Sequence, residues 1–153
     1  MLSEEAVAKF NSINLLDRFK AISEAFQTDT PLENYSKDRV LELFENLGYG
    51  FKYDKKESFF GIKSVENGYD FRFNLVLKYG IVEIIIWAKN IETEKEYGGV
   101  FSRLVKLIQK SNGVKEIARI GYPRFSNYDD LEKIVGELML IYEDFKTVLK
   151  SAA

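Results

Sequence analysis

Three carboxylates lie within five residues in the segment Glu92-Thr93-Glu94-Lys95-Glu96. Clustered acids of this kind can hold Mg²⁺ or Ca²⁺, or they can offer an acidic patch to a basic protein. The ligand spacing and glycine turn of an EF-hand calcium loop are absent, so no metal site is predicted. We predict a solvated loop ahead of a helix, in which Glu92, Glu94 and Glu96 are available to contact a protein partner.

The glycine pair of Tyr97-Gly98-Gly99 has one property of a phosphate-binding loop, because glycines leave backbone N–H groups accessible at the positive end of a helix. A P-loop also needs Lys followed by Ser or Thr, and a dinucleotide site needs a third glycine; neither pattern is present. We therefore expect the two glycines to let the chain turn into a closely packed helix. Tyr97 is assigned to the predicted contact surface and to no cofactor site.

Glu83 is the one carboxylate within the apolar segment 81–87, where burial could raise its pKa and make it an acid or a base. Pairing with Arg72 or Lys78 on a neighbouring strand is the alternative. The chain contains no His and no Cys, which excludes the usual general base, thiolate chemistry and cysteine metal sites. We predict no catalytic residue, no metal and no cofactor.

A loop rich in aromatic residues, Gly121-Tyr122-Pro123-Arg124-Phe125, is followed closely by Asn127-Tyr128. Tyr and Arg are enriched at binding hot spots, although the same rings could simply anchor the loop. We predict that this segment contacts a protein partner. The residues assigned to the contact are Tyr122, Arg124, Phe125, Tyr128, Asp129 and Asp130.

A second set of aromatic residues alternates with charges along the expected strands and could stack nucleic-acid bases. This set comprises Tyr53, Phe59, Phe60, Tyr69, Phe71, Phe73 and Trp87. Because of the alternation, we expect these rings on a buried face beneath the helices. The opposite face would then be a mixed-charge surface suited to a protein, formed by Lys52, Asp54, Lys63, Asp70, Arg72 and Lys78. A net charge of −2 argues against nucleic-acid binding.

The elements that position these groups follow from the hydrophobic periodicity. Apolar residues at steps of three and four predict one helix over residues 4–27, ended before Pro31. Ser36 is a suitable N-cap for a second helix, and Gly48 is a suitable C-terminal stop. The short connection predicts that the two helices pack as a hairpin.

The period then changes to two, which predicts strands at 51–53, 59–65, 69–78 and 81–89, with a tight turn at Glu66-Asn67-Gly68. Short turns between successive strands imply an antiparallel meander. A helix over 98–110, a short edge strand over 114–122 and a final helix capped by Ser126 or Asn127 complete the chain. We predict a single α+β domain over residues 1–153, in the order ααββββα(β)α.

This layout is similar to that of small, acidic, cytoplasmic immunity proteins of bacterial polymorphic or contact-dependent toxin systems. The resemblance covers the helical pair, the aromatic-rich meander, the helix led by Gly98-Gly99 and the helix that starts at Asn127-Tyr128-Asp129-Asp130-Leu131. It implies a non-enzymatic protein that binds and neutralises a cognate toxin domain as a one-to-one inhibitor. The resemblance assigns no individual residue to the toxin contact.

Two other functions stay open at this stage. A secretion-type chaperone or adaptor would be a homodimer, with the apolar stripe of residues 131–148 at its interface, whereas an immunity protein would be a monomer. A carboxylate-based enzyme would use Glu83 or the acids of segment 92–96. The start Met1-Leu2-Ser3-Glu4-Glu5 is unlike a signal peptide and the apolar runs are too short to cross a bilayer, so we predict a cytoplasmic protein that does not contact membranes.

Overall fold

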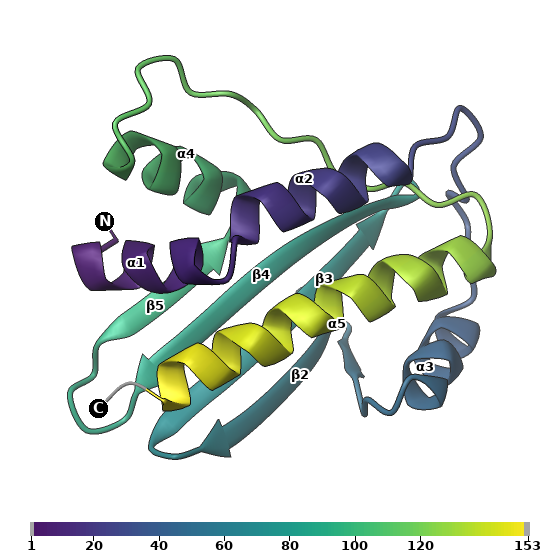
Figure 1. Ribbon diagram of the computed structural model, residues 1–153. Helices are drawn as coiled ribbons and strands as arrows, with labels where there is room; N and C mark the ends of the chain where they lie inside the picture. Colours follow the sequence, from purple (N-terminus) through teal and green to yellow (C-terminus); the bar gives the residue numbers. More distant parts are fainter. Residues whose placement is uncertain (1, 152–153) are drawn as a thin grey trace.

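The computed structural model describes residues 2–151 and has an α+β fold in which helices pack on an antiparallel sheet (Figure 1). The described helices are α1 (Glu4–Ser12), α2 (Leu15–Ala25), α3 (Lys37–Asn46), α4 (Phe101–Ser111) and α5 (Tyr128–Lys150). The described strands are β1 (Lys52–Asp54), β2 (Phe59–Glu66), β3 (Tyr69–Lys78), β4 (Ile81–Asn90) and β5 (Glu96–Val100). The order in the sheet is β1-β2-β3-β4-β5, and every neighbouring pair is antiparallel. The predicted fold class and meander are confirmed, with one strand more than expected.

The additional strand, β5, contains the segment predicted as a turn ahead of a helix. Gly98 pairs with Trp87 and Gly99 with Ile86 across the β4–β5 ladder. Gly98 has φ +102, and a Cβ atom there would lie 2.1 Å from the carbonyl oxygen of Ile86. Glycine is therefore required for β5 to approach β4. A strand built around two glycines shows no alternation of side chains, which is why the sequence pattern did not indicate it.

The segment 114–122, predicted as an edge strand, is irregular and stays outside the sheet. Gln109 of α4 holds it in place: the side-chain amide donates to the carbonyl oxygen of Ala118 at 2.7 Å and accepts from its N–H at 2.9 Å. Only beyond this segment does the chain meet the sheet, where Arg124 forms an isolated bridge with Ile81. Because β5 already pairs with the far half of β4, segment 114–122 lies beside α4 instead.

The single helix predicted over residues 4–27 is two helices, α1 and α2, separated at Asn14. Asn14 has a left-handed backbone with φ +54, a conformation that Asn adopts more readily than most residues. The guanidinium of Arg18 donates to the free carbonyl oxygen of Ile13 at 3.2 Å, which satisfies one acceptor at the break. The break rotates the apolar face, so that Leu15 rather than Leu16 is buried in α2.

Helix α3 has the predicted ends but a different neighbour. Ser36 caps it by accepting from the N–H of Arg39 at 3.3 Å, and Gly48 follows with φ +90. The predicted hairpin with the preceding helix is wrong. Helix α3 packs instead against α5 and against β1, the strand at one edge of the sheet (Figure 1). The linking segment passes the β3–β4 turn, where Pro31 and Leu32 lie against Gly80, and the N–H of Leu32 donates to the carbonyl oxygen of Phe125 at 2.8 Å.

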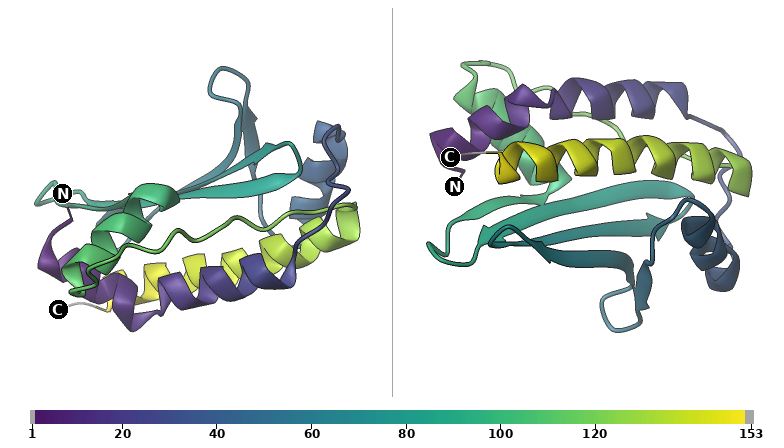
Figure 2. Two further views of the ribbon diagram at one scale, coloured as in Figure 1. Left: turned by 90° about the horizontal axis from the view of Figure 1, so that it is seen from above. Right: turned by 60° about the horizontal axis from the view of Figure 1, so that its bottom comes forward.

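Helix α5 is the central element of the helical layer. Its N-cap is Asn127, whose side chain accepts from the N–H of Asp130 at 2.8 Å, and it lies beside α1 and α2 on the same side of the sheet (Figures 1 and 2). Phe145 stacks on Phe10 at 5.2 Å between ring centroids, and Tyr142 stacks on Phe73 of β3 at 4.8 Å. Helices α1, α2 and α5 cover one face of the sheet, while α3 and α4 lie at its edges (Figures 1 and 2).

Candidate protein-binding surface

The opposite face of the sheet carries no helix of the described residues 2–151, and we call it the open sheet face (Figure 2). The cross-strand register places matching side chains in rows on this face, for example Lys63, Arg72 and Trp87 across β2, β3 and β4. The six charged residues predicted for a mixed surface all belong to this face: Lys52, Asp54, Lys63, Asp70, Arg72 and Lys78. Glu83, Lys89 and Glu96 belong to the same face.

Trp87 lies near the centre of the open sheet face and is half-buried. The Arg72 guanidinium sits 5.2 Å from the centroid of its ring, and the indole Nε1 donates to Oε1 of Glu96 at 3.1 Å. Arg72 in turn pairs with Asp70 at 3.2 Å. Gly98 occupies the position across the ladder, where it provides no side chain to cover the indole. A fixed aromatic ring bracketed by charges is typical of a binding hot spot.

A hollow of about 470 Å³ lies beside this cluster, where the β1–β2 hairpin bends away from the helical layer (Figure 2). Gly61 forms part of it, since a Cβ atom at this position would lie 2.6 Å from Oδ1 of Asn74 and 3.0 Å from the ring of Phe59. Lys63 and Arg72 also line it. Lys52, Tyr53 and Asp54 line it as well, so the hollow presents aromatic rings, an amide and charged groups of both signs to an interface side chain.

The strand aromatics divide between the two faces, which corrects the prediction that they share a buried face. Phe60, Phe71 and Phe73 are fully buried under the helices, as predicted. Phe59 and Trp87 face the other way, at register positions that belong to the open sheet face. Phe59 and Phe60 are neighbours on one strand and therefore point to opposite faces. In β4 the segment 81–87 is apolar on both faces apart from Glu83, so its pattern did not indicate which face the helices cover.

The acids of segment 92–96 lie in and beside the β4–β5 turn. The side chain of Asn90 accepts from the N–H groups of Glu92 and Thr93, each at 3.0 Å, and Glu94 takes a left-handed backbone with φ +62. Glu92 and Glu94 are exposed at the tip, whereas Glu96 belongs to the Trp87 cluster. The described residues contain no group of three or more acids arranged to hold a metal ion.

Tyr97 is buried under the sheet and does not form part of a surface. Its hydroxyl donates to Oε1 of Glu5 at 3.0 Å, and Lys95 pairs with the same carboxylate. Burial, followed by the neighbouring Glu5, raises the pKa of Tyr97, and the hydrogen bond from Lys95, followed by that from Tyr97, lowers the pKa of Glu5. These contacts fasten α1 to β5.

The aromatic loop at 121–125 anchors the chain to the start of β4. Phe125 is fully buried, and its N–H donates to the carbonyl oxygen of Gly80 at 2.9 Å. Tyr122 packs edge-on against Phe19 with the ring centroids 6.2 Å apart. Arg124 donates its backbone N–H to the carbonyl oxygen of Phe26 at 2.8 Å.

The start of α5 is anchored in a similar way. The hydroxyl of Tyr128 accepts from the N–H of Ser36 at 2.9 Å, and the guanidinium of Arg39 lies 4.0 Å from the centre of the Tyr128 ring. Asp129 is exposed and Asp130 is half-buried beside the N-cap. This group lies at the start of β4 and the acids of segment 92–96 lie beyond its end, so the structure does not bring the ten predicted contact residues together.

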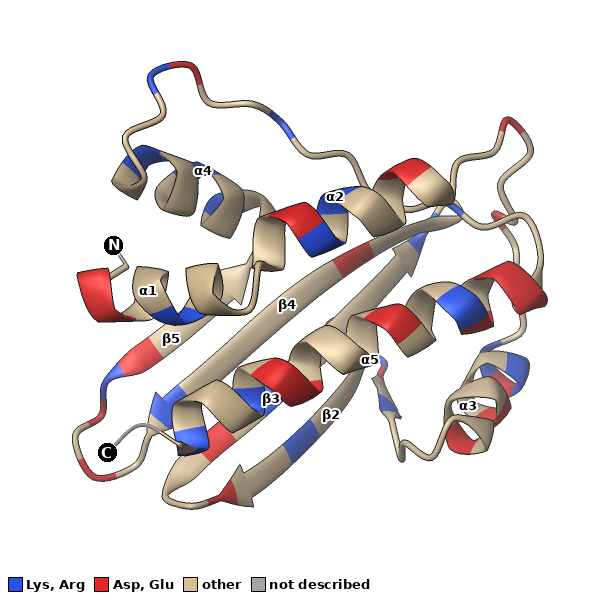
Figure 3. Ribbon diagram, in the orientation of Figure 1, with Lys and Arg blue, Asp and Glu red and all other residues tan. Residues whose placement is uncertain are grey.

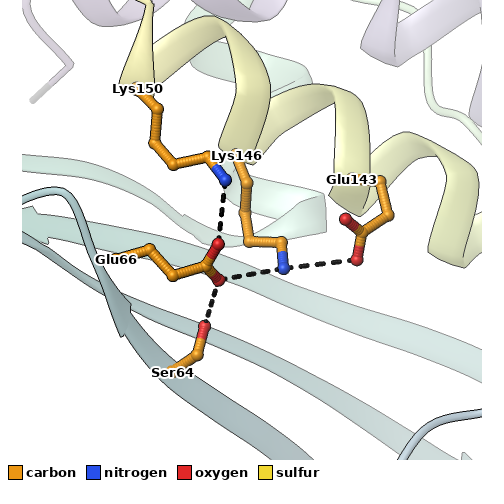
Figure 4. A network of polar contacts seen from close by, with 5 residues as sticks. All are labelled: Ser64, Glu66, Glu143, Lys146 and Lys150. Atoms are coloured by element: carbon orange, nitrogen blue, oxygen red, sulfur yellow. Dashed lines mark hydrogen bonds and ion pairs between the residues drawn. The ribbon is translucent and has the colours of Figure 1, made fainter.

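A charged cluster that the sequence reasoning missed ties α5 to the end of β2 (Figure 4). Glu66 accepts from Lys150 at 2.8 Å, from Lys146 at 3.1 Å and from the hydroxyl of Ser64 at 2.6 Å. Lys146 also pairs with Glu143 at 3.2 Å. The hydrogen bonds from Lys150, then from Ser64, lower the pKa of Glu66 to about 2. The two lysines four residues apart were the available signal, because that spacing places both on one face of a helix.

Comparison of the chain with protein-family models, with curated proteins and with solved structures gives no significant match. Among the described residues, no helix has the length and apolar character needed to span a membrane.

Proposed function

We propose that this protein is a non-catalytic protein-binding module and that its partner contacts the open sheet face. The observation that carries the proposal is the Trp87 cluster, an aromatic ring held between Arg72 and Glu96 on a sheet face without a helical cover. Trp and Arg at the centre of an interface supply most of its affinity, and surrounding charges accelerate encounter. The mixed charges of this face suit a protein better than a polyanion.

The arrangement of the carboxylates supports a non-catalytic role. Glu83 lies opposite Val76 on the neighbouring strand and forms no ion pair with the described residues, so the pairing considered for it does not occur. Within the β3–β4 ladder of the described residues, the flanking positions opposite Glu83 on its own face are Asn74 and Lys78, not a second acid. Glu66 is already paired with two lysines and a hydroxyl, contacts that tie α5 to β2.

The partner class that we propose is a bacterial toxin domain, as for the immunity proteins that the chain's layout resembles. A twisted sheet backed by α5 gives a stiff surface, which lowers the conformational cost of binding. The chaperone alternative relied on the stripe of residues 131–148 as a dimer interface. That stripe is core: Leu131, Ile134, Leu138, Ile141 and Phe145 are buried against the other helices and the sheet of the same chain.

The test uses a toxin domain encoded next to the gene of this chain, expressed in the same cells. We expect the wild-type protein to restore growth and to be recovered with the toxin, and Arg72→Glu to lose both. Leu140→Ala is the matched control, since Leu140 is 54% exposed on α5, on the helical side of the molecule. Equal protection by Arg72→Glu and the wild-type protein would refute the assignment to the open sheet face. Failure of the wild-type protein to bind the toxin would refute the toxin assignment.

A further inference from the structure

Helix α4 and the segment that follows it form the most basic part of the molecule (Figure 3). Residues 101–124 carry six basic side chains and one acidic side chain, a local net charge of +5 in a chain of net charge −2. The basic residues are Arg103, Lys106, Lys110, Lys115, Arg119 and Arg124. None of them forms an ion pair with a carboxylate of residues 2–151. These unpaired charges repel one another, which favours the approach of an acidic partner.

An apolar hollow of about 650 Å³ lies within this basic region, between α4 and segment 117–122. Val105 and Leu107 of α4 line it from one side, and Ile117 and Ile120 line it from the other. Ile117 is 41% exposed, so its side chain is accessible to a bound partner. Lys106, Lys110 and Arg119 belong to the same lining. We call this site the α4 groove.

The walls of the α4 groove are held at a fixed separation. Gln109 is 91% buried on α4, its exposed fraction being 9%, and its amide makes two hydrogen bonds to the backbone of Ala118. At the end of α4, the side chains of Asn112 and Asn11 exchange two hydrogen bonds of 2.9 and 3.2 Å. A buried polar side chain used in this way fixes the backbone beside it, so the groove exists before any partner arrives.

The backbone of the outer wall is available for pairing. Apart from Ala118, the N–H and C=O groups of residues 115–121 form no hydrogen bond with the described residues. Unpaired backbone groups of this kind can form hydrogen bonds with the main chain of a bound polypeptide while one of its side chains enters the hollow. Nucleic-acid bases would instead need exposed rings to stack on. The one ring in the groove, Tyr122, already packs against Phe19.

We propose that the α4 groove binds an acidic polypeptide segment of a partner protein. One large apolar side chain of that segment enters the hollow between Val105 and Ile117, and carboxylates on either side of it pair with Lys106, Lys110 and Arg119. The α4 groove is separate from the open sheet face, so this proposal does not depend on the proposed function.

The test measures binding of two short synthetic peptides, one alternating Glu with Leu and one alternating Glu with Ser. We expect the Glu–Leu peptide to shift the amide resonances of α4 and of residues 115–121. The Glu–Ser peptide should bind at least about tenfold more weakly, because burial of one Leu side chain is worth that factor or more. The double variant Lys106→Glu, Arg119→Glu should also lose at least about tenfold, since it replaces two attractive contacts with repulsive ones.

The matched control is Lys52→Glu, Lys63→Glu, which makes the same charge change on the open sheet face and should leave peptide binding unchanged. Equal binding of the two peptides would overturn the proposal, because charge alone would then account for it. The proposal also fails if a single-stranded oligonucleotide or an anionic lipid vesicle displaces the Glu–Leu peptide at lower concentration than the unlabelled peptide does. Resonance shifts confined to other parts of the chain would likewise contradict it.

Discussion

Replacing Glu66 with Gln should destabilise the fold by an amount that depends on pH. The folded protein holds the pKa of Glu66 at about 2, against an ordinary value of 4.5. At about 1.4 kcal/mol for each tenfold change in proton affinity, this difference corresponds to about 3 kcal/mol of stability at neutral pH. The side chain of Glu66 is still 29% exposed, so solvent screening reduces the expected loss to about 2 kcal/mol.

The direction of the pH dependence follows from a lowered pKa. The contribution of Glu66 is complete above its unfolded-state pKa of 4.5 and is lost as the pH falls towards about 2. Gln cannot ionise, so the gap between Glu66→Gln and the wild-type protein should close over this range, with more than half of it gone by about pH 3. Other carboxylates titrate in both proteins, so their contributions to the free energy of unfolding cancel in the difference between the variant and the wild-type protein.

Urea unfolding at several pH values between about 3 and 7 measures this gap. Glu24→Gln is the matched control: Glu24 faces Lys20 at 3.9 Å and is 69% exposed, so its replacement should cost less than about 0.5 kcal/mol. A loss in Glu66→Gln that stays constant from pH 7 to pH 3 would refute the reasoning, because it would reflect packing instead of charge. No loss at neutral pH would refute it as well.

Other changes test the sheet and its open face. Gly98→Ala should destabilise the fold by about 3 kcal/mol, because its Cβ atom would lie 2.1 Å from the Ile86 oxygen. Gly136→Ala on α5, where a Cβ atom meets nothing within 4 Å, should stabilise it by about 1 kcal/mol, and thermal unfolding of both variants compares the two. Trp87 is the only tryptophan, so its fluorescence reports on the open sheet face. A partner bound there should shift the emission to shorter wavelength and protect Trp87 from quenching by acrylamide. The Glu–Leu peptide bound in the α4 groove should cause neither change.

Sequence patterns predicted the elements that carry strong periodicity and failed where local geometry decides. The long apolar repeat of α5, the cap at Ser36 and the turn at Asn67-Gly68 were all predicted correctly, because each depends on residues close together in the chain. Strand β5 was missed because glycines leave no alternation to detect. The break at Asn14 was missed because apolar residues continue at steps of three and four through Leu16, although Leu15 takes the buried position in α2.

The candidate surfaces were harder to predict than the elements. Aromatic side chains on a strand are compatible with either face, and only the position of α5 decides that Phe73 is covered while Trp87 is not. The α4 groove depends on Gln109 bonding to Ala118, a contact between a helix and an irregular segment that no periodicity reports. The predicted contact residues Tyr97 and Phe125 are instead buried, since aromatic composition alone does not distinguish a hot spot from a core.

The position of α5 has a consequence for synthesis of the chain. All five strands are complete at Val100, but the helix that covers Phe71 and Phe73 begins at Tyr128 and ends at Lys150. At a translation rate of about 5–20 residues per second, several seconds pass between synthesis of the last strand and synthesis of the helix that covers the aromatic face of the sheet. During that interval Phe71 and Phe73 lack the rings of Phe145 and Tyr142 that pack on them, so the native core forms only after α5 has been synthesised.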